Sequence, residues 1–260
     1  MPQPQLPPQP FCFVADFGSQ NPIDFQKLAA ATSNGSKCVA VVLRATRSNS
    51  QLDDQFLTRF DAAGRAGFLV GAYAFNTAEP AKAQADRFLQ ATKNCGAIFR
   101  CLDFETIMIG KNPSPHQMSL ANAIAFLDQV DQATGHRTWI YGGDRIKSQI
   151  VSATDAQRDF LAQHGLWGCE YGALQWKNVA SNKKPLPWQA VTLWQYTGDG
   201  VESPTGLPTT LSGLEDGADL SIFQGTRDDL AKIWTGAPLA PPAAVIAATQ
   251  PPAPSPTASS

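Results

Sequence analysis

The chain has 260 residues, a formal net charge of −2 and a sequence pI of about 5.9. Hydrophobic residues make up 43% of it and charged residues 16%, which suffices for one large domain of the size at which α/β barrels often run undivided. No basic stripe is present, so the composition argues against nucleic acid as a partner and against docking on an anionic membrane. No apolar run reaches the roughly 18 residues of a membrane span, so no membrane insertion is expected.

The two ends differ in composition from the middle. Residues 1–10 form a Pro/Gln-rich extension that lacks the positive and apolar regions of a secretory signal peptide, so we expect a protein made in the cytoplasm without a standard signal. Residues 237–260 form a Pro/Ala-rich tail that we expect to be extended or disordered. The folded unit is therefore predicted to be a single domain over residues 11–236, and we expect a monomer.

The five cysteines are odd in number and match no metal-binding spacing: Cys12, Cys38, Cys95, Cys101 and Cys169. Four of them fall in strand-like runs, so we interpret them as buried free thiols rather than as a disulfide framework. Cys12 and Cys101 share the strand parity of Asp16 and Asp103, which leaves open a pair that faces a common interior.

Apolar β-type runs alternate with helix-period segments through the first half of the chain. Strands are predicted over 11–15, 38–43, 68–75, 98–103 and 138–141. Helices are predicted over 25–32, 52–63, 80–92 and 115–134, with Ser50 as the cap of the second. A helical stretch over 146–164 then precedes a strand over 166–171, and a loop over 172–187 precedes strands over 190–196 and 217–222. A helix over 228–234 closes the domain.

Eight strands, the first five in βα alternation, indicate a flattened TIM-like (β/α)5(β)3 barrel. Barrel enzymes carry their sites at the C-terminal ends of the strands. Asp103 and Glu105 stand at one such end with i, i+2 spacing, which on a strand puts both side chains on one face, roughly 6.6 Å apart along the backbone. Two acids held close together push their pKa values apart, so that one stays protonated while the other stays charged, as glycoside hydrolysis needs.

The remaining strand ends add acids for proton transfer and aromatic faces that suit sugar rings. We predict catalytic roles for Glu105, Asp103, Asp16 and Asp219. We predict substrate binding by Tyr73, Phe75, Tyr141, Tyr171, Trp194 and Gln195. Arg44 and Tyr196 also fall at strand ends.

Some of these residues have purely structural interpretations. Asp16 could cap the turn after the first strand, and Asp219 could cap the last helix. Tyr73 and Tyr141 could pack inside the barrel with satisfied hydroxyls. Trp139, Trp167 and Trp234 are interpreted as core, whereas Trp176 and Trp188 are either a sugar platform or the anchor of a lid.

Metal and nucleophile chemistry have little support in the sequence. His116, His136 and His164 fall away from the strand ends, and no His-Glu or His-Cys cluster offers a metal site. No Ser-His-Asp constellation and no phosphate-binding glycine loop is present. Carboxylate chemistry is the option that the residues support.

Short motifs follow one another in order between residues 11 and 223: Val14-Ala15-Asp16, Val42-Leu43-Arg44-Ala45-Thr46, Gly71-Ala72-Tyr73-Ala74-Phe75, Ala83-Gln84-Ala85-Asp86-Arg87-Phe88, Leu102-Asp103-Phe104-Glu105, Trp139-Ile140-Tyr141, Leu193-Trp194-Gln195-Tyr196-Thr197 and Ala218-Asp219-Leu220-Ser221-Ile222-Phe223. This ordered set resembles the glycoside hydrolase family 25 lysozymes. The resemblance implies the flattened barrel and an N-acetylmuramidase, which cleaves the β-1,4 bond between N-acetylmuramic acid and N-acetylglucosamine in peptidoglycan. It implies Glu105 as proton donor, Asp103 as the residue that orients the substrate N-acetyl group as internal nucleophile, and Asp16 and Asp219 as acids that shape the charge of the site.

The same resemblance implies no metal and no organic cofactor, and it names peptidoglycan glycan strands as the partner. The site of action would be the cell wall, in the periplasm or outside the cell, for a phage lysin, an exported effector or a self-remodelling enzyme. Three segments depart from the family pattern: Phe17-Gly18-Ser19-Gln20-Asn21, Arg44-Ala45-Thr46-Arg47-Ser48 and Ala74. The acid pair Asp103 and Glu105 lies outside these departures. Because the departures alter positions expected to contact substrate, two alternative functions remain open: a non-catalytic glycan-binding barrel and a chitinase-like glycosidase. The spacing of the acids leaves the retaining and inverting outcomes open.

Overall fold

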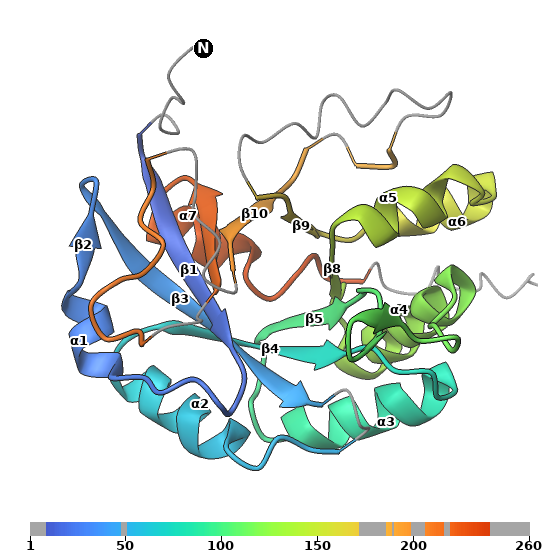
Figure 1. Cartoon of the computed structure of the whole chain (residues 1–260), viewed down its shortest axis with the longest axis horizontal. Coiled ribbons are helices and arrows are strands. Elements are labelled where there is room, and N and C mark those ends of the chain that lie inside the picture. Colours follow the sequence, from blue (N-terminus) through green and yellow to red (C-terminus); the bar gives the residue numbers. More distant parts are fainter. Residues whose placement is uncertain are drawn as a thin grey trace, which may run out of the picture.

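The computed structural model describes residues 9–47, 51–171, 186–188, 190–198, 206–215 and 219–239. Over these residues the chain forms a barrel (Figure 1) whose strands follow the order β1-β3-β4-β5-β8-β9-β10-β11 and close again on β1. The strands are β1 (Phe11–Phe17), β3 (Ser36–Thr46), β4 (Leu69–Phe75), β5 (Phe99–Asp103), β8 (Trp139–Gly142), β9 (Leu166–Cys169), β10 (Leu193–Thr197) and β11 (Asp219–Gln224). All eight predicted strands are confirmed, and so is the barrel.

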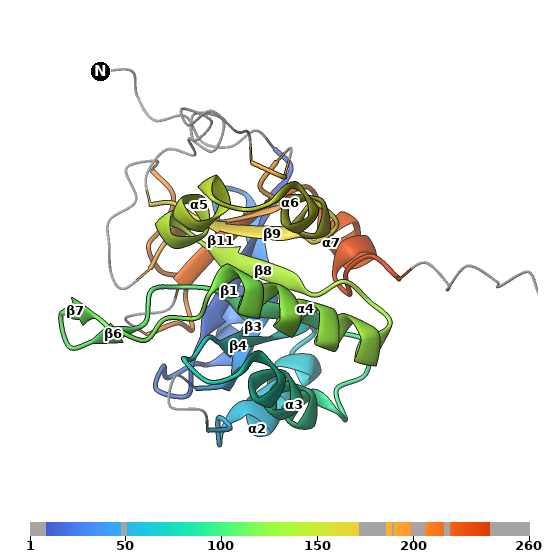
Figure 2. The same ribbon diagram turned by 90° about the vertical axis from the view of Figure 1, so that its right-hand side faces the viewer.

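Short strands stand outside this barrel. β2 (Thr32–Ser33) pairs with the start of β3, and β6 (Met108–Ile109) pairs with β7 (Asn112–Pro113) as a two-stranded hairpin. Figure 2 shows this hairpin projecting from one end of the barrel, opposite the end that α7 covers. The helices are α1 (Phe25–Ala30), α2 (Phe56–Arg65), α3 (Ala81–Thr92), α4 (Leu120–Thr134), α5 (Asp144–Val151), α6 (Asp155–Leu161) and α7 (Arg227–Ile233).

Four helix predictions need correction. The helix expected from residue 115 begins at Leu120, after the cap Ser119, and Thr32, expected in the first helix, belongs to β2. The single helix expected over 146–164 is two helices, because Thr154 caps α6 in a reciprocal capping box with Gln157. The second helix begins at Phe56 rather than at Leu52, because Leu52 is engaged in a β-bridge with Thr46. Its expected cap, Ser50, lies outside the described residues.

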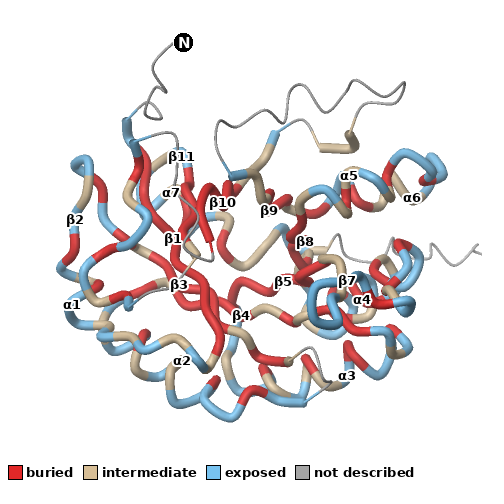
Figure 3. Tube along the Cα trace, viewed as in Figure 1, coloured by how far each residue is buried: buried red, intermediate tan, exposed pale blue. Residues whose placement is uncertain are grey.

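Strand alternation divides the apolar side chains between two layers. In Figure 3 the barrel strands are mostly buried, whereas the helices around them carry both buried and exposed residues. Along β1, Cys12 and Val14 belong to the cluster inside the barrel, and Phe11, Phe13, Ala15 and Phe17 belong to the layer between barrel and helices. This outer layer is the larger one, and it buries the apolar faces of α2, α3 and α4. The periodicity that predicted the strands thus also sets which side chains remain inside for packing or chemistry.

The interior is filled at the N-terminal end of the parallel strands. Trp234, which follows α7, is stacked on Phe99 with 4.7 Å between ring centroids, and its Nε1 donates to the Val70 carbonyl at 3.0 Å. Gly71 permits this approach, because a Cβ there would lie 2.9 Å from the Phe99 side chain and 3.1 Å from Trp234. The open end of the barrel is therefore the C-terminal one.

One strand runs against the others. β11 is antiparallel to both of its neighbours, β1 and β10. Its first residue, Asp219, therefore lies at the same rim as the last residues of the parallel strands, directly opposite Asp16. The sequence placed Asp219 at the correct rim, although it stands at the start of its strand and not at the end.

The five cysteines are free thiols. Cys12 and Cys101 face the barrel interior, as their parity predicted, whereas Cys95 and Cys169 are only half-buried. Burial raises the pKa of the Cys12 and Cys38 thiols to about 12.

The described chain continues slightly past the predicted domain end. The Ala237 carbonyl accepts from the Arg137 amide at 2.7 Å, and the Leu239 amide donates to the Gly135 carbonyl at 2.9 Å. These residues, expected in the tail, lie against the turn between α4 and β8. Within the described ranges, no helix combines the length and the apolar character that crossing a membrane requires.

Candidate active site

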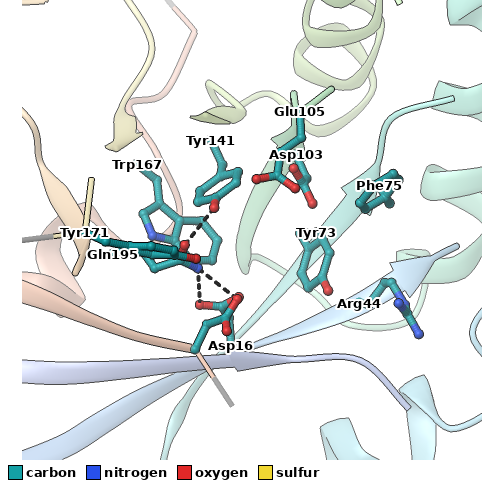
Figure 4. Close-up of a pocket in the computed structure, with 11 residues that line it drawn as sticks. Asp16, Arg44, Tyr73, Phe75, Asp103, Glu105, Tyr141, Trp167, Tyr171 and Gln195 are labelled. Carbon is teal, nitrogen blue, oxygen red and sulfur yellow. Dashed lines mark hydrogen bonds between the residues drawn. The ribbon is translucent and has the colours of Figure 1, made fainter. Parts of the chain in front are cut away.

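A cavity of about 260 Å3 opens at the C-terminal rim of the barrel (Figure 4). All of the predicted site residues except Trp194 line it: Asp16, Tyr73, Phe75, Asp103, Glu105, Tyr141, Tyr171, Gln195 and Asp219. They come from seven different strands or strand ends, so only barrel closure brings them together.

Asp16 and Asp219 form one side of the cavity and share a single amide donor. Gln195 Nε2 lies 3.1 Å from Asp16 Oδ2 and 3.3 Å from Asp219 Oδ2, and the Tyr141 hydroxyl donates to Gln195 Oε1 at 2.7 Å. Because Tyr141 occupies the amide oxygen, both N–H groups of Gln195 face the carboxylates. The amide thus offsets repulsion between two acids that stand directly opposite each other in the β1–β11 pair.

Of the two cap interpretations of Asp16 and Asp219, the one that made Asp219 the cap of the last helix is wrong. Both carboxylates face the cavity and accept from Gln195, and the helix after β11 is capped instead by Thr226. Gly198 fits tightly beside them, because a Cβ there would lie 2.7 Å from Asp219 Oδ1 and 2.4 Å from the Tyr171 hydroxyl.

Asp103 ends β5 and is 8% exposed. Its Oδ1 is fully buried and has no hydrogen-bond partner within the described structure. Burial raises the pKa of Asp103 well above its ordinary value, and the charges of Glu105, Asp16 and Asp219 raise it further, against the opposing effect of Arg44. The surroundings of Asp103 therefore favour the neutral form of its carboxyl group more than water does.

Glu105 stands two residues beyond Asp103 and is half-buried. Asn76 holds its backbone: Asn76 Nδ2 donates to the Glu105 carbonyl at 2.8 Å, and the Glu105 amide donates to Asn76 Oδ1 at 3.3 Å. Asn76 is itself fully buried, and its backbone N–H donates to the Asp103 carbonyl at 3.1 Å. The Asn76 side chain therefore imitates a further residue pair of the β4–β5 ladder and extends it beyond the strand ends.

Sequence reasoning missed Asn76 as a site residue. Its signal is a single polar residue directly after Phe75, the last residue of β4. Such a residue is typical of ordinary turns, so only the contact with Glu105 distinguishes it.

Arg44 lines the cavity but did not appear among the predicted site residues. Its Nε donates to Asp53 Oδ2 at 3.1 Å and its Nη2 to Gln20 Oε1 at 2.8 Å. Gly18 packs against the guanidinium, since a Cβ at that position would lie 2.6 Å from Arg44 Cζ. Gly18 and Gln20, from one segment that departs from the family pattern, thus meet Arg44, which begins another.

The aromatic residues divide between cavity and packing. Trp167, interpreted as core, is indeed buried, but it also lines the cavity and packs edge-on to Tyr141 with 4.9 Å between centroids. Tyr141, which is buried, and Tyr73, which is half-buried, both have a place in the cavity wall. Burial, reinforced by nearby carboxylates, raises the pKa of both phenols.

Trp194 lies elsewhere than predicted. It is 8% exposed, belongs to the layer outside the barrel, and donates from Nε1 to the Glu170 carbonyl at 2.7 Å. The cause is strand parity, because Gln195 faces inward and its neighbour must face outward. Trp188 donates to the His164 carbonyl at 3.0 Å and packs on the same outer layer, whereas Trp176 lies outside the described residues. Among the residues with described positions, no three His, Cys, Asp or Glu side chains form a group that could hold a metal ion.

The comparison with known proteins decides the family. The model of the glycosyl hydrolases family 25 matches residues 17–204. The chain belongs to glycosyl hydrolase family 25. Membership bears out the predicted glycosidase of the lysozyme type, while Asp16 and Asp219 flank the matched range and reach the site through β1 and β11.

Solved structures share this family 25 fold. A bacterial lysozyme from Streptomyces coelicolor superposes with a TM-score of 0.65 at 18% identity, over 88% of this chain and 99% of that one. The modular autolysin LytC from Streptococcus pneumoniae, solved with a synthetic peptidoglycan ligand, gives a TM-score of 0.63 at 16% identity, over 84% of this chain and 48% of that one. A curated relative, the uncharacterized protein YegX of Escherichia coli O157:H7, is 22% identical over 81% of this chain and 68% of its own length.

Proposed function

We propose that this family 25 member cleaves the β-1,4 bond between N-acetylmuramic acid and N-acetylglucosamine in peptidoglycan, with Glu105 as proton donor. The observation that carries the proposal is the pair of acids at the end of β5, one buried beside three other acids and one half-exposed at the rim. Such a difference in surroundings separates the protonation behaviour of two carboxyl groups, which is how glycosidases obtain an acid and an anion at one pH. The site of action would be the cell wall.

The first step uses Glu105 as general acid. Its proton passes to the glycosidic oxygen as the bond from that oxygen to the anomeric carbon breaks. The carbonyl oxygen of the substrate's own N-acetyl group forms the new bond to the anomeric carbon and gives an oxazolinium ion. Water then attacks the anomeric carbon, the bond from that carbon to the N-acetyl oxygen breaks so that the oxazolinium ring opens, and the Glu105 carboxylate accepts a proton from the water.

Asp103 assists by orienting the N-acetyl group. Its buried Oδ1 lacks a partner within the described structure, so it offers an acceptor to the amide N–H of the substrate. That hydrogen bond favours the charged form of Asp103 and compensates the cationic intermediate, while the proton held by the pair moves to Glu105. Gln195 and Tyr141, predicted as substrate ligands, are assigned instead to fixing Asp16 and Asp219.

The test is the variant Glu105→Gln, which keeps the shape of the side chain and removes its proton. We expect release of reducing ends from purified peptidoglycan to fall by about 10²-fold or more, the typical contribution of a general acid. Chitin oligomers serve as the second substrate, since a chitinase-like enzyme would cleave them in preference. Binding to sacculi without any release of reducing ends by the unmodified chain would instead indicate a glycan-binding barrel.

A further inference from the structure

A second cavity adjoins the catalytic one. It measures about 630 Å3 and shares Glu105 and Tyr171 with the first cavity as common walls. Its other walls come from the segment after β5 and from the start of α5: Thr106, Met108, Gly143, Asp144, Arg145, Lys147, Cys169 and Glu170. The volume falls within the range of roughly 300–1,000 Å3 that is typical of ligand sites.

The walls of this cavity carry charges of both signs in ordered positions. Lys147 is only 15% exposed, and its Nζ lies 3.4 Å from Glu170 Oε2 and 3.6 Å from Asp144 Oδ1. The Arg145 guanidinium lies 4.8 Å from the centre of the Phe104 ring, and Arg145 donates to the Met118 carbonyl. Its Nε is buried without a partner in the described structure.

An apolar ledge completes the cavity. Met108 is 51% exposed and lies in the hairpin formed by β6 and β7, whose next residue, Ile109, is 65% exposed. Figure 2 shows that this hairpin projects from the barrel. Met108 therefore gives an apolar wall to a cavity whose other walls carry charges.

We propose that this second cavity binds the peptide stem that peptidoglycan carries on N-acetylmuramic acid. The inference rests on the proposed muramidase function. A second sugar ring is uncharged, and recognition of sugars uses aromatic faces and neutral hydrogen bonds. Among the described residues that line this cavity, Tyr171 is the single aromatic one. A stem peptide carries carboxylates, an amine-bearing side chain and aliphatic carbons, which match Lys147, Glu170 and Met108 respectively. Because the stem is attached to the sugar whose bond is cleaved, it must leave the catalytic cavity beside Glu105, where the two cavities meet.

The test compares two forms of one substrate: glycan strands with their stems intact, and the same strands after an amidase has removed the stems. We expect Lys147→Met to raise KM about tenfold on the intact strands, the effect of losing one charge-assisted contact, with kcat unchanged. On the stripped strands the variant should match the unmodified chain. Lys93→Met, at an exposed lysine directly after α3, is the matched control and should leave KM and kcat unchanged on both substrates.

A second variant removes doubts about folding. Met108→Ser alters a half-exposed side chain of the hairpin and should also raise KM on intact strands alone. Equal effects on both substrates, or no effect on either, would overturn the peptide site while leaving the muramidase proposal standing. Failure of the unmodified chain to cleave either substrate would overturn the muramidase proposal itself.

Discussion

Asp103 and Glu105 are two residues apart and have different surroundings. Asp103 is buried against Asp16, Asp219 and its own neighbour, and Glu105 reaches the rim between the two cavities. The raised pKa of Asp103 also affects the stability of the fold. The carboxyl group ionises more readily in the unfolded chain than in the folded one, so its ionisation lowers the free energy of unfolding.

Asp103→Asn should therefore stabilise the fold at neutral pH, by about 1–2 kcal/mol. The folded pKa of Asp103 is raised, so its contribution to stability is fully present below the ordinary value of 3.8 and is lost as pH rises above it. The asparagine variant avoids that loss. Thermal unfolding of both chains between pH 3 and pH 8 measures the difference, which should vanish at the acid end. A constant difference across this range would contradict the assigned cause.

Asn76→Ala should lower kcat for peptidoglycan about tenfold to a hundredfold with little change in KM, because a displacement of Glu105 by about 1 Å costs on that order. The reason is the loss of both hydrogen bonds that hold the Glu105 backbone. Asn76→Asp is the informative companion: it keeps the acceptor but loses the donor to the Glu105 carbonyl. The kcat of Asn76→Asp should lie between that of the unmodified chain and that of Asn76→Ala. Steady-state kinetics with the pH profile separate displacement of Glu105 from general unfolding, which would reduce the active fraction without altering the profile.

At the scale of elements, two pieces of the chain after β10 complete the barrel. β11 closes it against β1 and, by running antiparallel, delivers Asp219 to the mouth. The residue after α7, Trp234, fills the opposite end against Phe99. Closure and filling come from the segment in which the βα alternation had already ended.

Trp234→Ala should destabilise the fold by about 3–5 kcal/mol, since it empties a buried aromatic site and leaves the Val70 carbonyl without its donor. Trp234→Phe should cost less because the stacking on Phe99 persists. Chemical denaturation measures both. Leu57→Ala, at a side chain of α2 that is 52% exposed, is the control and should change the free energy of unfolding by less than about 0.5 kcal/mol. A small effect of Trp234→Ala would show that the end of the barrel is supported elsewhere.

For the whole molecule, the site exists only in the closed barrel. Asp16 lies near the start of the chain and Asp219 near the end of the fold, yet they are direct cross-strand partners. The termini of the described structure also contact the domain: Gln9 donates to the Asn34 carbonyl, and Leu239 donates to the Gly135 carbonyl.

A chain trimmed to residues 9–239 should keep the melting temperature and the hydrolytic activity of the full chain within measurement error. A chain that ends at residue 215 loses β11 and α7 and should fail to show a cooperative thermal transition, because β1 and β10 are left as unpaired edges. Circular dichroism and turbidity assays on both chains test this. Loss of folding on trimming to 9–239 would place stabilising contacts in the removed ends.

The sequence by itself determined the eight strands, their order as a barrel and the rim at which the acids gather, because strand periodicity and strand ends are local properties of the chain. It also pointed to the family, since the motifs lie at those ends. Only the tertiary structure decided that Trp194 faces away while Trp167 reaches the cavity, that Asn76 holds Glu105, that one amide serves both Asp16 and Asp219, and that a charged second cavity adjoins the first. Local parity states that Trp194 and Gln195 face opposite sides of their strand, but which side is the interior, like the other contacts, depends on how strands distant in sequence pack together.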